Sequence, residues 1–237
     1  MRNRLAVVAG LLLAIGWASL AHPGQPSRTI LVLGDAAYIT DADIRQAAGV
    51  PVSRDPATPL QDVAVLVLAN IAFPSLPHPI QNGLVDFVNG GGSVLITGGA
   101  QSFGSGGYKA VASIIPFEIR SDSDWRFITF RSPVALQPGH PILAGVTFIT
   151  VGTINDMNPR PGAVEILQSP GGGGAGTRVG GGHAGGGSFL FPLIAEVAVG
   201  AGRVIGIAFD LNDFAGMPDR DLFVRNTLTY LLAASRR

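Results

Sequence analysis

The residues whose types and spacing most suggest chemistry lie in one loop, residues 98–108, which directly follows an apolar run. The stretch Ala-Gln-Ser-Phe-Gly around Ser102 is similar to the turn on which many hydrolases display a nucleophilic serine. Asp156 and His183 then follow in the chain order of a Ser, Asp, His triad. Glycines after Ser102 delay any helix, and His183 lies in a glycine-rich tract that would not orient an imidazole. A hydrolase using Ser102 is therefore the alternative hypothesis.

Other polar residues stand at the ends of predicted strands, where parallel sheets bind ligands. The sequence predicts ligand-binding residues at these ends and in the loop, and we predict no catalytic residue among them. They are Asp35, Gln101, Ser102, Phe103, Gly106, Gly107, Tyr108 and Asp210. Oxygens of Asp210, Asn212 and Asp213 suit a hard cation, but carboxylates that are solvated or cap a helix are the simpler explanation. We therefore predict neither a metal site nor a cofactor.

Two further groups of residues have both a functional and a structural explanation. His140, in Pro-Gly-His-Pro, is predicted to be a turn residue bonded to the backbone, with a ligand contact as the alternative. Trp125 and Phe127, beside Arg126 and Arg131, would either line a groove or pack within a strand.

The elements that must position these residues begin with three continuous apolar runs, at 28–35, 62–71 and 92–99. Continuous runs indicate strands buried on both faces, as in a parallel sheet. A helix is predicted between the second and third runs, with one apolar face and proline and glycine at its ends. That face consists of Ile80, Leu84, Phe87 and Val88.

The second half of the chain predicts antiparallel additions to this sheet. Segments 117–134 and 146–156 contain short alternating strands, and two later strands are joined by a turn at residues 200–202. A glycine-rich insertion at 170–188 is too poor in apolar side chains to pack, so we expect it to be flexible. A closing helix repeats the apolar spacing of the first. The fold class is therefore α/β, with a mostly parallel central sheet flanked by helices and antiparallel strand extensions, over residues 28–235.

Composition and the first residues limit the partners and the compartment. The formal net charge is zero, which argues against nucleic acid as a partner, and the absence of cysteine excludes disulfides and a thiolate nucleophile. Residues 1–21 are typical of a signal peptide, with Arg2 and Arg4 before an apolar run and small residues at 19–21. We expect a periplasmic or secreted protein, attached to a membrane only if this segment stays as an uncleaved anchor.

Several segments together resemble a known family. They are the loop Gly-Gly-x-x-Ser-Phe-x-x-Gly-Gly-Tyr, the stretches "QPGHPILAGV" and "GAGRVIGIAFDLNDF", and the closing "LFVRNTLTYLL". Together they resemble the extracytoplasmic glutamine amidotransferase-like domains, which are relatives of class I glutamine amidotransferases and have a flavodoxin-like core. In true amidotransferases a cysteine occupies the turn after the central strand. Here Gly99 or Ala100 stands at that position, and "FDLNDF" replaces the expected His–Glu pair.

The resemblance implies the fold and argues against a glutaminase reaction. The leading hypothesis is an exported, non-catalytic domain that binds a small molecule, a glycan or a cell-envelope protein. The alternatives are a hydrolase of another class, using Ser102 or a cleft carboxylate such as Asp210, and a purely structural interaction module.

Overall fold

The structure is a computed structural model that describes residues 28–39, 49–148, 150–170, 190–212 and 218–235. The expected signal peptide, His183, Asp213 and all but the first residue of the glycine-rich insertion lie outside the described residues. Within the described part, no helix has the length and apolar character needed to cross a membrane.

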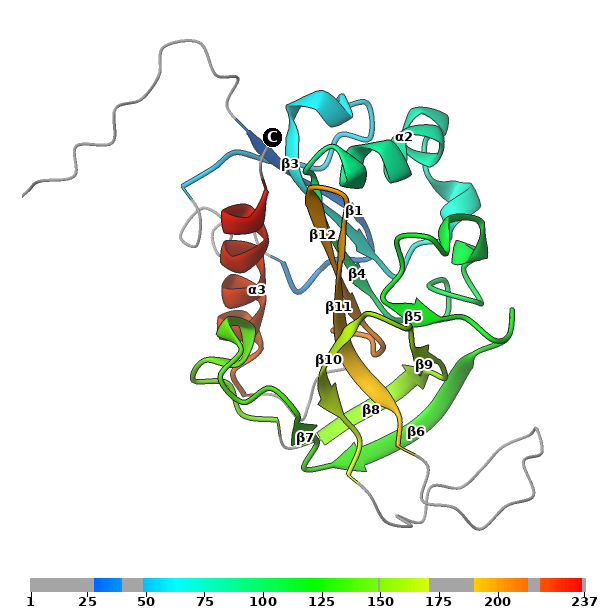
Figure 1. Ribbon diagram of the computed structural model, residues 1–237, viewed down its shortest axis with the longest axis vertical. Coiled ribbons are helices and arrows are strands. Elements are labelled where there is room, and N and C mark those ends of the chain that lie inside the picture. The colour runs from blue at the N-terminus through cyan, green and yellow to red at the C-terminus, as the bar shows by residue number, and fades with distance from the viewer. Residues whose placement is uncertain (1–27, 40–48, 149, 171–189, 213–217, 236–237) are drawn as a thin grey trace, which may run out of the picture.

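An eight-stranded sheet forms the centre of the molecule, in the order β2-β1-β3-β4-β12-β11-β10-β7 (Figure 1). The first five strands in that order are parallel, and the last three are antiparallel to their neighbours. The strands are β1 (Thr29–Gly34), β2 (Val52–Ser53), β3 (Val63–Ala69), β4 (Ser93–Thr97), β7 (Val134–Ala135), β10 (Val164–Gln168), β11 (Pro192–Val199) and β12 (Gly202–Ile207).

The predicted parallel core is confirmed, and burial explains why its strands lack alternation. Every residue of β3 and β4 is buried, because side chains on both faces of the sheet meet a hydrophobic cluster. Short 3-10 helices are inserted between the strands: η1 (Leu60–Asp62), η2 (Phe73–Ser75), η3 (Tyr108–Val111) and η4 (Pro141–Leu143).

One long helix covers each face of the sheet (Figure 1). Helix α2 (His78–Asn89) buries Ile80, Leu84, Phe87 and Val88, as predicted, and helix α3 (Arg220–Ala234) packs on the opposite face. Asp219 occupies the N-cap position of α3, but its carboxylate accepts from the Thr147 N–H at 3.0 Å and does not cap the helix.

Two small antiparallel pairs lie beside the main sheet: β5 (Phe117–Glu118) with β9 (Asn158–Pro159), and β6 (Trp125–Arg131) with β8 (Thr150–Asn155). The β6–β8 ribbon crosses the carboxyl edge of the parallel strands (Figure 1). Ile154 forms a bridge with Phe209, and the Asn155 N–H donates to the Ala208 carbonyl at 2.7 Å. The edge where such sheets usually bind ligands is thus partly covered by the ribbon.

Candidate functional site

The chain turns after β4 on two glycines, and each is required for a different reason. At Gly98 a Cβ atom would lie 2.6 Å from the backbone of Ala208, because the segment after β12 passes alongside. Gly99 has a φ of 150°, and a Cβ there would lie 2.0 Å from the side-chain oxygen of Asn70. Neither position accepts a larger residue without movement of its neighbours.

Three polar side chains from other elements hold the loop that follows. Asn70, after β3, accepts from the Gln101 N–H at 2.9 Å. Asn155, at the end of β8, accepts from the Gly99 N–H at 3.0 Å and donates to Asp124 at 2.9 Å. The loop is therefore fixed by side chains that are distant in sequence.

Asp124 is the centre of this arrangement, and its residue is only 1% exposed. Its carboxylate accepts four hydrogen bonds: from the Gly104 and Ser105 N–H groups, the Ser105 hydroxyl and the Asn155 amide, at 2.8–3.0 Å. All four donors are neutral groups, and such bonds to a charged acceptor are stronger than neutral ones. We call Asp124, Asn155 and Asn70 the loop clamp.

Ser102 does not have the geometry of a displayed nucleophile. The residue is fully buried, and its hydroxyl has no hydrogen-bond partner among the described residues. A nucleophilic serine needs a base within hydrogen-bond reach and contact with substrate. Asp156, the acid of the alternative triad, instead forms an ion pair with Arg120 at 2.7 Å and approaches Arg126 at 4.0 Å.

Two aromatic residues predicted to bind ligand belong to the core, which corrects that expectation. Phe103 is fully buried, with its ring edge-on to Phe117 at 5.4 Å. Tyr108 is also fully buried and donates its hydroxyl to the Ile71 carbonyl at 2.9 Å, and burial raises the pKa of this phenol. Their side chains pack the loop against the sheet and α2, so they are not available to a ligand.

The remaining predicted residues divide by exposure. Gln101, Gly107 and Asp35 are exposed, Asp210 is half-buried, and Gly106 is buried with its N–H donating to the Ser102 carbonyl. No structural observation tests ligand binding by any of them, so that role stays a prediction.

The ends of β1 and β12 approach each other at the same edge of the sheet. Asn212 donates to the Asp35 carbonyl at 3.0 Å, and its N–H bonds to the Asp210 carboxylate at 2.8 Å, which closes a short turn. Tyr38 lies beneath, donating to the Thr97 hydroxyl at 3.2 Å. Burial, with a smaller contribution from Asp210 and Asp35, raises the Tyr38 pKa, so it stays protonated. In the described part of the chain, no three His, Cys, Asp or Glu residues are grouped to hold a metal.

His140 is the turn residue that the sequence predicts, and it also joins a buried polar cluster. It caps η4, with Nδ1 accepting from the Ile142 N–H at 3.4 Å. Its Nε2 lies 3.6 Å from Glu196, which also pairs with Arg203 at 2.9 Å and accepts from Tyr230 at 3.0 Å. Burial lowers the His140 pKa, with Glu196 opposing the shift.

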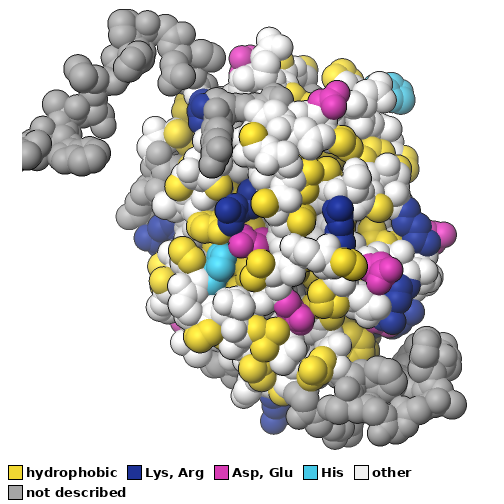
Figure 2. Space-filling model, in the orientation of Figure 1, with side chains coloured by type: hydrophobic (Ala, Val, Ile, Leu, Met, Phe, Trp, Pro, Cys, Tyr) yellow, Lys and Arg dark blue, Asp and Glu magenta, His cyan; other side chains and the backbone are white. Residues whose placement is uncertain are grey.

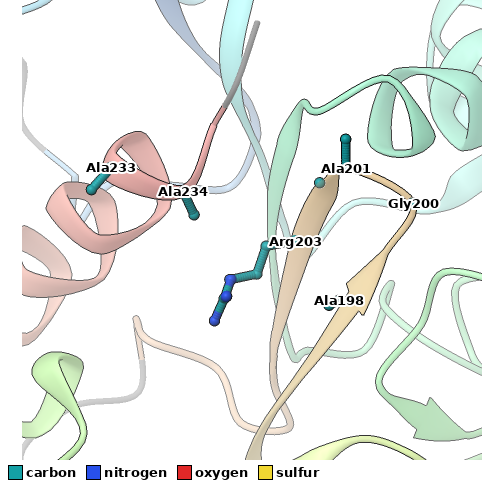
Figure 3. A pocket seen from close by; sticks show the side chains of 7 residues that line it. Ala198, Gly200, Ala201, Arg203, Ala233 and Ala234 are labelled. Atoms are coloured by element: carbon teal, nitrogen blue, oxygen red, sulfur yellow. The ribbon is translucent and has the colours of Figure 1, made fainter.

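A small pocket lies at the other end of the sheet, away from the loop clamp. It has a volume of about 210 Å³ and lies between the β11–β12 turn and the end of α3 (Figure 3). Arg203 is its charged lining residue, and alanines and glycines form the rest. At this size the pocket is below the usual range for ligand sites, about 300–1,000 Å³.

Comparison with known proteins gives structural matches only. No family model and no curated protein matches the chain. A cytoplasmic protein from Salmonella typhimurium LT2 matches with a TM-score of 0.61 and 16% identity, over 86% of this chain and 99% of that one. A protein from Bacteroides uniformis described as ThuA-like matches with a TM-score of 0.52 and 10% identity, over 90% and 95%. One from Thermoplasma acidophilum, described as part of a GMP synthase, matches at 0.50 and 10%, over 89% and 96%.

The chain has a glutamine amidotransferase-like fold. Identities of 10–16% show the fold alone and assign no activity. In this amidotransferase-like fold, the turn after β4 carries Gly99 and the exposed Ala100 where the resemblance leads us to expect a cysteine.

Sequence reasoning missed the loop clamp of the amidotransferase-like fold. Asp124 lies in a polar stretch, "SDSD", and Asn155 precedes another aspartate, a context typical of surface residues. The partial signal was Asn70, which stands directly after a strand that the sequence predicts, at the edge where loops meet.

Proposed function

We propose that this chain is a non-catalytic domain with an amidotransferase-like fold, which acts outside the cytoplasm by binding a ligand or partner at the carboxyl edge of its sheet. The observation that carries the proposal is the enclosure of Ser102, the hydroxyl in the loop after β4, together with the absence of cysteine from the chain. Without an accessible nucleophile at this turn, acyl transfer of the amidotransferase kind has no starting atom.

The surviving polar groups at this edge suit recognition better than catalysis. Asp35, Gln101 and Asp210 come from the ends of three different strands, and none of them is fully buried. Carboxylate and amide oxygens accept hydrogen bonds from hydroxyl groups, so a glycan or another hydroxyl-rich molecule is the ligand class that we favour. A cell-envelope protein is the partner class that the expected export would supply.

Two assays on the purified protein test the absence of catalysis. Glutaminase and esterase turnover, and labelling by a serine-reactive fluorophosphonate, are each measured against Ser102→Ala. We expect no turnover and no labelling in either protein. Turnover or labelling that disappears in Ser102→Ala would establish the hydrolase instead.

A glycan array tests the binding half of the proposal. Signals that Asp210→Asn removes would support binding at this edge. Asp122→Asn is the matched control, because that side chain is 81% exposed and pairs only with Lys109 in the described part of the chain. Signals unchanged by Asp210→Asn, Gln101→Ala and Asp35→Asn would exclude this edge as the glycan site.

A further inference from the structure

Strand β6 is the outer strand of the two-stranded ribbon. It pairs with β8 on one side, and among the described strands none pairs with its other side (Figure 1). An open edge of this length, seven residues, presents unpaired backbone groups that another strand is able to join.

The side chains of β6 divide cleanly between the two faces of the ribbon. Phe127, Thr129 and Arg131 are exposed, whereas Ile128 and Phe130 are half-buried against the core. Phe127 is 80% exposed, and the nearest aromatic ring is Trp125, edge-on at 6.2 Å. Hydrophobic side chains also gather over this lower part of the molecule (Figure 2). Such an exposed aromatic ring beside an open edge favours a surface that becomes covered.

We propose that a second copy of this chain covers the edge, with the two β6 strands pairing antiparallel about a two-fold axis at Thr129. In that register, residue pairs whose numbers sum to 258 face each other. Phe127 therefore faces Arg131 of the second copy, Thr129 faces its own copy, and Ile128 faces Phe130. The dimer goes beyond the proposed ligand binding and does not depend on it.

The sequence of β6 is complementary to itself in this arrangement. Two symmetrical contacts place an arginine against a phenylalanine ring, the Thr129 pair joins hydroxyls, and the inward pair is apolar. Arg126 would face Ser132, so no like charges oppose each other. The formal net charge of zero also means that two copies do not repel strongly. These features favour a second copy over an unrelated strand.

The pairing is expected to be short, and the dimer therefore weak. The β6–β8 register shifts between Arg126 and Thr129, which marks a bulge that limits a regular edge to residues 127–131. Interfaces of this extent belong to the small, transient class.

Sedimentation velocity over a range of protein concentrations tests the dimer. We expect a concentration-dependent dimer that Phe127→Asp weakens about ten-fold or more, because both symmetrical contacts are lost. Leu190→Asp is the matched control, since Leu190 is 50% exposed and lies outside β6, and it should leave the dimer unchanged. A protein that stays monomeric at every concentration, a dimer that Phe127→Asp does not weaken, or one that both variants weaken equally overturns the proposal.

Disulfide cross-linking tests the register, because the chain has no cysteine of its own. Thr129→Cys places two thiols directly opposite each other, within reach of a disulfide, so mild oxidation should give a covalent dimer. Arg131→Cys lies on the same exposed face, but its copy is four residues away along the strand, about 13 Å at 3.4 Å per residue. It should not cross-link. Equal cross-linking of both variants, or of neither, contradicts pairing centred on Thr129.

Discussion

Removal of Asn155 and Asp124, singly and together, measures the loop clamp. Asn155→Ala leaves the buried Gly99 N–H without its side-chain acceptor and removes one of the four donors to the Asp124 carboxylate. An unsatisfied buried group costs about 1–3 kcal/mol, and a hydrogen bond to a charged group contributes about 1.5–3 kcal/mol. We therefore expect Asn155→Ala to lower the free energy of unfolding by about 3 kcal/mol, or Tm by roughly 6–12 °C in a domain of this size.

The double variant separates the pair from its surroundings. Asp124→Ala should cost about as much as Asn155→Ala or more, because the Gly104 and Ser105 N–H groups lose their acceptor. In the double variant, the combined loss should fall short of the sum of the single losses by about 1.5–3 kcal/mol, since the shared bond is removed only once.

Urea denaturation followed by circular dichroism gives these free energies. Asp122→Ala serves as the control, because an 81% exposed side chain should change stability by no more than about 0.5 kcal/mol. If the coupling between Asn155 and Asp124 fell below about 0.5 kcal/mol, or Asn155→Ala were as mild as the control, the loop clamp would not hold the loop.

Three further predictions follow from the same geometry. Gly99→Ala should lower the free energy of unfolding by about 2 kcal/mol or more, whereas Gly139→Ala, which meets open space, should be nearly neutral by the same denaturation assay. The lowered His140 pKa means that the unfolded state takes up the proton more readily, so stability should fall as pH drops below about 6.5, and His140→Gln should flatten that dependence in pH-dependent melting. Iodoacetamide should modify Ala100→Cys much faster than Ser102→Cys, because Ala100 is exposed and Ser102 is fully buried; equal rates would show that the loop opens readily.

The sheet and helices were predictable because their signals are local. Strands β1, β3 and β4 are continuous apolar runs, and α2 shows the helical period with proline and glycine at its ends. These patterns depend on which side chains must leave water, and a sequence displays that directly.

The loop was harder to predict because its glycines and polar residues suggest an exposed ligand site. Its aromatic residues are the better guide, since Phe103 and Tyr108 bury large apolar areas against the core. The burial of Asp124 was not predictable from composition, because it depends on donors from Gly104 and Asn155, which a sequence does not place in space.

The neighbours of β4 in the sheet have a consequence for synthesis of the protein. One edge pairs with β3, which precedes it closely, but the other pairs Ser93 with Arg203 and Thr97 with Ile207. Until the ribosome has delivered β12, the buried strand at the middle of the sheet has an open apolar edge, and the Ala208 carbonyl that receives Asn155 does not yet exist. The nascent chain is thus exposed to aggregation for most of its elongation. A chaperone that accompanies it must shield β4 above all other strands.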